Sequence, residues 1–125
     1  MEDDMYGKEL IIDLHNCDPS GFNRKDIEEY FSELCLRIDM QRCEFYFWDD
    51  VGVQEEEKQT SPHTKGTSAV QFILTSNITI HTLDILKKIF INVFSCKDFD
   101  VKLVEDFTIE FFGGEIVKST TVVRL

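Results

Sequence analysis

The stretch GTSAVQFILTSNITIHTLDILKKIFINVFSC, residues 66–96, decides the fold of this chain. It contains two short apolar runs on either side of the hydroxyl pair Thr75–Ser76. Runs of this length that are rich in Val and Ile are typical of β-strands. We therefore expect two strands, 67–74 and 77–82, or one long strand bent near Ser76.

Alternating apolar residues predict the rest of the sheet. After a break at 83–86, residues 88–95 place Ile89 and Ile91 on one face of a strand and Phe90 on the other. A similar pattern predicts a strand at residues 42–48, and a nearly continuous apolar run predicts a buried strand at residues 8–15. Residues 115–125 are expected to close the chain as a further strand.

Two segments have the spacing and the end signals of helices. Asn23 is typical of a helix N-cap and predicts a helix that runs to about Asp39. A second helix is expected between a cap at Asp98 or Asp100 and the glycine pair at 113–114. Both helices carry apolar residues along one side, so each should pack that side on a sheet.

This order of strands and helices predicts an α+β fold. We expect a two-layer sandwich, with one mostly antiparallel sheet and two helices on one face. A ferredoxin-like split arrangement is the nearest alternative. Residues 49–65 lose apolar periodicity, which predicts a mobile loop, the only linker-like segment. Because a second domain would not fit after it, we expect a single domain, 1–125.

Composition narrows the class of partner. The net charge of −11 argues against nucleic acid and anionic membranes, and it is compatible with a cationic substrate. No apolar stretch is long enough to cross a bilayer, and the N-terminus is acidic rather than a signal sequence. We expect a cytoplasmic protein.

The four cysteines of the chain show no CxxC pair, which indicates reduced thiols. His15 and Cys17 alone do not make a zinc signature, so no metal is expected.

Four reactive side chains lie along the opening stretch: Ser68, Ser76, His81 and Cys96. Their spacing, and the contexts Ile-His-Thr and Phe-Ser-Cys-Lys-Asp, resemble the short, single-domain prokaryotic form of the S-adenosylmethionine decarboxylase family. These are pyruvoyl enzymes of polyamine synthesis. In that family a serine precedes the processed serine by eight residues, and a histidine and a cysteine follow it by five and twenty. The run KELIIDLHNCDP near the N-terminus adds to the resemblance. The resemblance implies the same kind of two-layer sandwich.

The resemblance implies a role for each of these residues. Ser76 would become the pyruvoyl group through cleavage at Thr75–Ser76, which would leave a β chain 1–75 and an α chain 76–125. Ser68 and His81 would assist processing, with His81 as the base. The pyruvoyl ketone would form a Schiff base with the amine of the substrate, and Cys96 would donate a proton after carbon dioxide leaves. A neutral thiol suits that last role.

Strand geometry complicates a site within one chain. Ser76 and His81 are five residues apart, so on a regular strand their side chains point to opposite faces. Either the chain bends between them, or His81 comes from a second copy of the protein. Because sites of the short family members are shared between two subunits, we expect a homodimer.

The chain departs from the family at the residues that hold the substrate. Thr75-Ser76-Asn77 stands where the family has Glu-Ser-His. Leu83-Asp84-Ile85 stands where it has Trp-Pro-Glu, whose glutamate binds the ribose, so Asp84 could substitute only if the loop shifts. Pro62 stands where the family has an adenine-stacking phenylalanine. These losses favour a smaller amino acid than S-adenosylmethionine.

Three functional hypotheses follow. The first is a pyruvoyl-dependent decarboxylase of spermidine synthesis that resembles S-adenosylmethionine decarboxylase. The second is an arginine or ornithine decarboxylase on the same scaffold, which would suit the acidic composition. The third is an uncleaved, non-catalytic regulatory homologue that binds an active relative. Whether the chain is cleaved distinguishes the two enzyme hypotheses from the hypothesis of a regulatory homologue.

Overall fold

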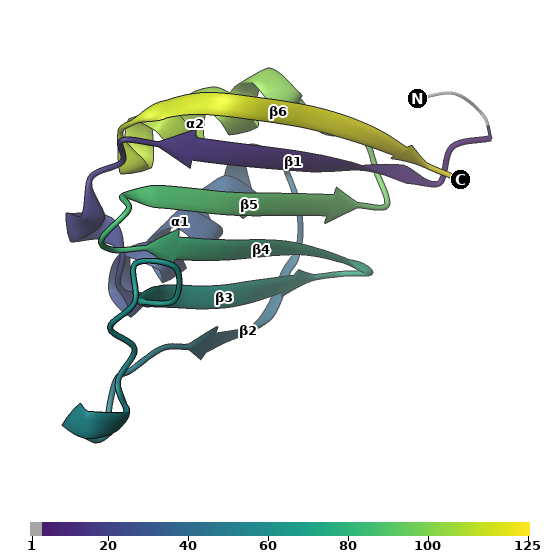
Figure 1. Cartoon of the computed structure of the whole chain (residues 1–125). Coiled ribbons are helices and arrows are strands. Elements are labelled where there is room, and N and C mark those ends of the chain that lie inside the picture. The colour runs from purple at the N-terminus through teal and green to yellow at the C-terminus, as the bar shows by residue number, and fades with distance from the viewer. Residues whose placement is uncertain (1–3) are drawn as a thin grey trace.

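Six antiparallel strands form one sheet, and two helices lie on one of its faces (Figure 1). The computed structural model describes residues 4–125. The elements in chain order are β1 (Gly7–His15), α1 (Arg24–Arg37), β2 (Arg42–Trp48), β3 (Gly66–Ile73), β4 (Ser76–Leu83), β5 (Lys88–Ser95), α2 (Val101–Phe112) and β6 (Glu115–Arg124), with short 3-10 turns at Pro19–Gly21 and Glu55–Glu57. The strand order is β2-β3-β4-β5-β1-β6. The predicted α+β sandwich is therefore confirmed, and the ferredoxin-like alternative is not formed.

The inner face of the sheet and the two helices enclose the core. Alternate residues of β1, β4 and β5 are fully buried there: Leu10, Ile12, Leu14, Ile78, Ile80, Ile89, Ile91 and Val93. Tyr30 of α1 stacks on Phe107 of α2 with ring centroids 5.5 Å apart. Its hydroxyl shares a 2.7 Å hydrogen bond with Thr108, which satisfies a polar group that the core would otherwise leave unpaired. The helices are thereby fixed to each other as well as to the sheet.

The other side of the sheet, here called the outer face, is not covered by either helix (Figure 1). Apolar and aromatic side chains nevertheless lie on it because residues alternate along each strand. Trp48 is 62% exposed and Phe72 is 46% exposed. Tyr46 packs edge-on against Phe72 with ring centroids 6.3 Å apart. A contiguous set of exposed rings of this kind is typical of an interaction surface.

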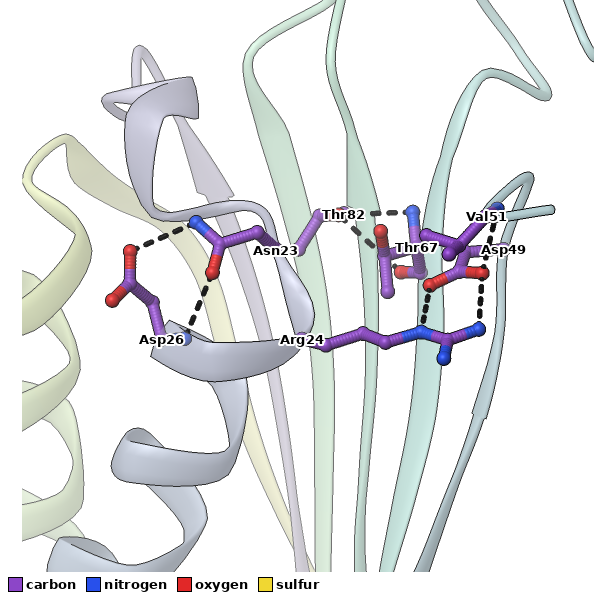
Figure 2. Close-up of polar contacts among 7 residues, drawn as sticks. All are labelled: Asn23, Arg24, Asp26, Asp49, Val51, Thr67 and Thr82. Atoms are coloured by element: carbon purple, nitrogen blue, oxygen red, sulfur yellow. Dashed lines mark hydrogen bonds and ion pairs between the residues drawn. The ribbon is translucent and has the colours of Figure 1, made fainter.

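Polar contacts at the start of α1 hold the loop that follows β2 (Figure 2). The Asn23 side chain caps the helix by accepting a 2.9 Å hydrogen bond from the backbone N–H of Asp26. Arg24 donates two 2.7 Å hydrogen bonds to the carboxylate of Asp49, the first residue after β2. The same carboxylate accepts a 3.0 Å bond from the backbone N–H of Val51. This clamp fixes where residues 49–65 leave the sheet.

The element boundaries differ from expectation mainly at β3 and β4. These are two strands joined by the two-residue turn Leu74–Thr75, with Ile73 paired to Ser76. The alternative of one bent strand is therefore wrong. Asp100, rather than Asp98, accepts the capping hydrogen bond of α2 from Leu103. Within residues 4–125, neither helix is long and apolar enough to cross a membrane.

Candidate active site

Ser76 and Cys96 meet at one end of the sheet, beside the turn between β3 and β4. Ser76 opens β4 with its side chain on the inner face, where the residue is only 6% exposed. Cys96 follows β5, the neighbouring strand, and its backbone N–H donates a 3.0 Å hydrogen bond to Ser76 Oγ. The pairing of β4 with β5 therefore brings together two residues that are twenty positions apart.

Thr75 completes this group of residues. Its hydroxyl lies 3.2 Å from Cys96 Sγ and 2.7 Å from the carbonyl oxygen of Leu74, and it can donate to either. The Cys96 thiol in turn lies 3.9 Å from the same carbonyl. The turn thus places one hydroxyl and one thiol directly beside the Thr75–Ser76 peptide bond.

A cavity of about 410 Å³ opens at this group. Its lining combines the end of β3, the start of β4 and the residues after β5 with the turn between α1 and β2: Asp39, Met40, Gln41, Ile73, Leu74, Ser76, Ser95, Cys96 and Lys97. Lys97 forms an ion pair with Asp39 at 3.5 Å, which joins two sides of the cavity. The volume is sufficient for a small ligand.

The Cys96 thiol is more acidic than an ordinary cysteine. The hydrogen bond from the Thr75 hydroxyl is the largest cause that lowers its pKa, followed by the hydrogen bond with Ser76. Lys97 adds a smaller electrostatic contribution in the same direction. A donor that hydrogen-bonds a thiolate favours the charged form. The Cys96 thiol therefore gives up its proton at a lower pH than an ordinary cysteine thiol does.

Ser68 and His81 form a second group on the outer face. The two residues lie opposite each other on β3 and β4, and Ser68 Oγ lies 2.7 Å from His81 Nδ1. A hydroxyl paired with an imidazole in this way can be deprotonated by it or can orient it. The sequence placed both residues in the site, and the structure brings them into direct contact.

Two aromatic residues flank the Ser68–His81 pair. Trp48 on β2 is opposite Ser68, and Phe90 on β5 is opposite His81, so the four residues form one row across the sheet. All four line a cavity of about 380 Å³, to which the loop contributes Gln59, His63 and Thr64. Sequence reasoning did not include the aromatic pair in the site. Only the register between neighbouring strands could have revealed them, because Trp48 lies outside the motif and nothing in the sequence pairs Phe90 with His81.

The two groups do not meet within one chain. The side chain of Ser76 is buried on the inner face and that of His81 is exposed, and β4 continues without interruption between them. They are five positions apart along the strand, a distance of roughly 16 Å. The expectation that they face opposite sides is confirmed, and the chain does not bend to bring them together.

Asp84 lies apart from both groups. It lines a different cavity, of about 290 Å³, together with Lys58 and Lys65. Its backbone N–H donates to the carbonyl oxygen of Lys65 at 3.0 Å. Its Oδ1 is buried and has no hydrogen-bond partner within residues 4–125, and burial raises the pKa of the carboxyl. The structure therefore does not bring Asp84 to the residues that would process the chain.

Metal ligands do not gather in the described part of the chain. Among residues 4–125, no three His, Cys, Asp or Glu side chains are arranged to hold a metal ion. Cys17 is buried, and burial raises the pKa of its thiol to about 11. A thiol held in its neutral form is a poor ligand, because metals bind the thiolate.

Comparisons with known proteins agree with this architecture. The crystal structure of the adenosylmethionine decarboxylase from Aquifex aeolicus VF5 is similar, with a TM-score of 0.72 and 17% sequence identity, over 96% of this chain and 91% of that one. At this identity the likeness shows a shared fold. No curated protein sequence matches the chain. The sequence model of one family, described as S-adenosylmethionine decarboxylase, matches residues 8–125. Since this match covers almost the whole chain, the protein belongs to the S-adenosylmethionine decarboxylase family, a family of carboxy-lyases.

Proposed function

We propose that this protein is a self-processing decarboxylase in which Ser76 becomes a pyruvoyl group after cleavage at Thr75–Ser76. The observation that carries the proposal is the position of Ser76 Oγ. It follows a tight turn, opens onto a cavity and accepts a hydrogen bond from the backbone of Cys96. Family membership supports the reaction class.

The residues present fit a pyruvoyl group at position 76. The cavity gives a small substrate room beside the group, and Cys96 supplies a thiol at the same place. The carbonyl that must be attacked belongs to Thr75, in a hairpin turn where it is not part of the ladder between β3 and β4. No metal is needed for this chemistry.

Formation of the group uses the chain's own atoms. Ser76 Oγ attacks the carbonyl carbon of Thr75, the C–N bond breaks, and its proton passes to the nitrogen, which leaves an ester. Removal of the Ser76 Cα proton by a base then breaks the Cβ–O bond, releasing the Thr75 carboxylate and leaving dehydroalanine. Its imine form takes up water and loses ammonia to give the ketone. A cleaved chain therefore ends at Thr75 and restarts at a blocked residue.

Cys96 is proposed to donate the proton that replaces the lost carboxyl group. A pyruvoyl ketone supplies an electron sink for the loss of carbon dioxide from an amino acid. The lowered pKa of the Cys96 thiol favours rapid proton transfer. It also means that the thiol is in its donating form only below that pKa.

A second copy of the chain is proposed to supply Ser68 and His81. Two sheets can pack through their outer faces around a two-fold axis that lies between them, perpendicular to the strands. This axis reverses the strand direction of the second copy, so its Ser68–His81 pair lies at the end of the sheet that carries the β3–β4 turn of the first. There it would approach the Thr75–Ser76 bond from the exposed Thr75 side, while Ser76 Oγ faces the inner cavity. The exposed rings of Tyr46 and Phe72 would then be buried. Each dimer would contain two shared sites.

The substrate is proposed to be an amino acid of polyamine synthesis. S-adenosylmethionine is the substrate that the family name implies. Arginine or ornithine is the second candidate, and one observation favours it. Ile85, which stands where the family has its ribose-binding glutamate, is 50% exposed and offers no carboxylate for a ribose. The neighbouring Asp84 lies in a different cavity from Ser68 and His81.

Intact mass of the purified protein under denaturing conditions tests the proposal. We expect two fragments that divide at Thr75–Ser76, the second with a pyruvoyl N-terminus. Ser76→Ala should remain a single chain, whereas the matched control Ser119→Ala on the edge strand β6 should be cleaved normally. Release of carbon dioxide from S-adenosylmethionine, arginine and ornithine then identifies the substrate. A full-length chain that persists on long incubation would reject self-processing and favour a regulatory homologue.

A further inference from the structure

The turn that contains the proposed cleavage point has an unusual backbone. Thr75 has a φ of +56°, in the left-handed region. It is the second of only two residues between β3 and β4, and Leu74, the first, is not among the residues with positive φ. A turn with positive φ only at its second central position normally has Gly or Asn there. A β-branched residue in this region is a genuine outlier, because its Cβ substituents crowd the backbone.

Other left-handed residues of the protein are better suited to this conformation. Within residues 4–125, three further non-glycine residues have positive φ: Asn16, Asp39 and Lys87. Asn and Asp tolerate the region through local hydrogen bonds of their short side chains, and Lys is not branched at Cβ. Thr75 is the only β-branched residue of this set, so the left-handed conformation is least favourable at the residue that precedes the proposed cleavage point.

Contacts on both sides hold the turn in place. The backbone N–H of Leu74 donates a 3.3 Å hydrogen bond to the carbonyl oxygen of Gln41, which precedes β2. On the other side, the Thr75 hydroxyl reaches Cys96 Sγ at 3.2 Å. The pairing of β3 with β4 continues up to Ile73 and Ser76, so both ends of the turn are held. A strained residue persists only where its surroundings determine its conformation in this way.

We propose that the strained conformation of Thr75 promotes cleavage of the bond that follows it. This inference rests on the proposed self-processing. While the Thr75–Ser76 peptide bond is intact, the hairpin fixes the φ of Thr75. Once Ser76 Oγ has attacked and the C–N bond has broken, the link between the strands is longer and more flexible, and after elimination Thr75 is a free chain end. The strain is thus present in the precursor and absent from the product. Thr75 acts here as a positioning residue.

Three variants separate strain from the other properties of Thr75. Thr75→Gly removes the strain and the hydroxyl, and Thr75→Val keeps the β-branching but removes the hydroxyl. Lys87→Gly is the matched control, because it relieves a left-handed residue in the other hairpin turn, between β4 and β5. Two quantities are measured: the half-time of cleavage, by intact mass of freshly synthesised chain, and the melting temperature of each variant in a Ser76→Ala background, which cannot be cleaved.

We expect Thr75→Gly to lengthen the cleavage half-time at least fivefold and to raise the melting temperature more than Lys87→Gly does. Thr75→Val should be cleaved faster than Thr75→Gly, and Lys87→Gly should be cleaved at the rate of the unmodified chain. Cleavage of Thr75→Gly at the unmodified rate or faster, or equal slowing by Lys87→Gly, would overturn the inference and leave the proposed function intact. A chain that is never cleaved would overturn both.

Discussion

Ser76 and His81 lie on the same uninterrupted strand, β4, yet their side chains occupy opposite faces of the sheet. Each has its own partner on its own face, Cys96 for the serine and Ser68 for the histidine. The machinery of the proposed reaction is therefore divided into two halves that a single chain cannot join. This division leads directly to a test by complementation.

Two inactive variants should restore processing when they are produced together. A Ser76→Ala chain cannot be cleaved but keeps His81, and a His81→Ala chain keeps the serine. If a second copy supplies the histidine, a tagged His81→Ala chain should be cleaved only when Ser76→Ala chains are present. The measurement is intact mass of the tagged chain after co-expression. Cleavage of His81→Ala alone at the unmodified rate would reject the shared site.

Dimer formation should depend on the outer face. Phe72→Asp places a charge beside Tyr46 in the proposed interface. Because burial of an unpaired charge is costly, the dissociation constant of the dimer should rise at least tenfold. Leu36→Asp is the matched control. Leu36 is 74% exposed on α1, on the helix side of the sheet. Analytical ultracentrifugation compares the two variants with the unmodified protein, and equal dissociation of both would argue against this interface.

Stability should depend on pH through the clamp between Arg24 and Asp49 (Figure 2). The hydrogen bond from Arg24 is the largest cause that lowers the pKa of Asp49. A folded-state pKa below the unfolded value contributes stability above the unfolded pKa, and that contribution is lost as pH falls through the folded value. Asp49→Asn should therefore lower the free energy of unfolding at pH 7 by about 1 kcal/mol or less, because Arg24 is half exposed and water screens the pair. The difference from the unmodified protein should shrink near pH 3.

Urea unfolding at both pH values checks this, with Asp106→Asn as control. Asp106 forms an exposed ion pair with Lys102 on α2. Such an exposed pair within a helix contributes little to stability. If Asp106→Asn lowered the free energy of unfolding as much as Asp49→Asn does, the clamp would contribute no more to stability than an ordinary exposed ion pair.

Asp84 should show the opposite pH dependence. Burial raises the pKa of this carboxyl, so the charged form is disfavoured in the folded state. Its contribution to stability is then present below the unfolded pKa and is lost as pH rises through the folded pKa. Asp84→Asn should raise the melting temperature at pH 7 and leave it nearly unchanged at pH 3. The same variant tests the predicted role in binding, since loss of a substrate contact would raise KM.

Cys96 should be alkylated by iodoacetamide at lower pH than an ordinary thiol. Its pKa is lowered chiefly by the Thr75 hydroxyl, so Thr75→Val should move the midpoint of the alkylation rate to higher pH. Both chains carry Ser76→Ala, which prevents cleavage and removes the smaller effect of Ser76 equally from each, and the modified peptide is followed by mass. Cys96→Ser identifies the signal of the remaining thiols. An unchanged midpoint in Thr75→Val would remove the hydroxyl as the cause.

Periodicity was sufficient to predict the layers of this fold. β2 and β5 have the predicted bounds, Arg42–Trp48 and Lys88–Ser95, because their apolar residues alternate and turn residues flank them. Asn23 was recognised as an N-cap because its side chain competes well for free backbone N–H groups. These are local signals, which act within a few residues and can be read from one segment at a time.

The turn between β3 and β4 lacks such a signal. The sequence Leu74-Thr75 contains no Gly, Asn or Pro, so a single bent strand remained possible until the pairing of Ile73 with Ser76 was known. The position of Trp48 beside Ser68 likewise depends on register between strands, which local patterns do not specify. The four motif residues were found by their spacing, but their division into two groups required the three-dimensional arrangement.

Strand order also governs how a cleaved molecule would hold together. β1 belongs to residues 1–75, yet it lies between β5 and β6, which belong to residues 76–125. The two fragments would thus be interlaced, joined by the ladders β3–β4, β5–β1 and β1–β6. They could not dissociate without unfolding the sheet. Folding of the intact precursor is a unimolecular event, whereas recovery of the cleaved form after denaturation would require two chains to meet and would depend on their concentration.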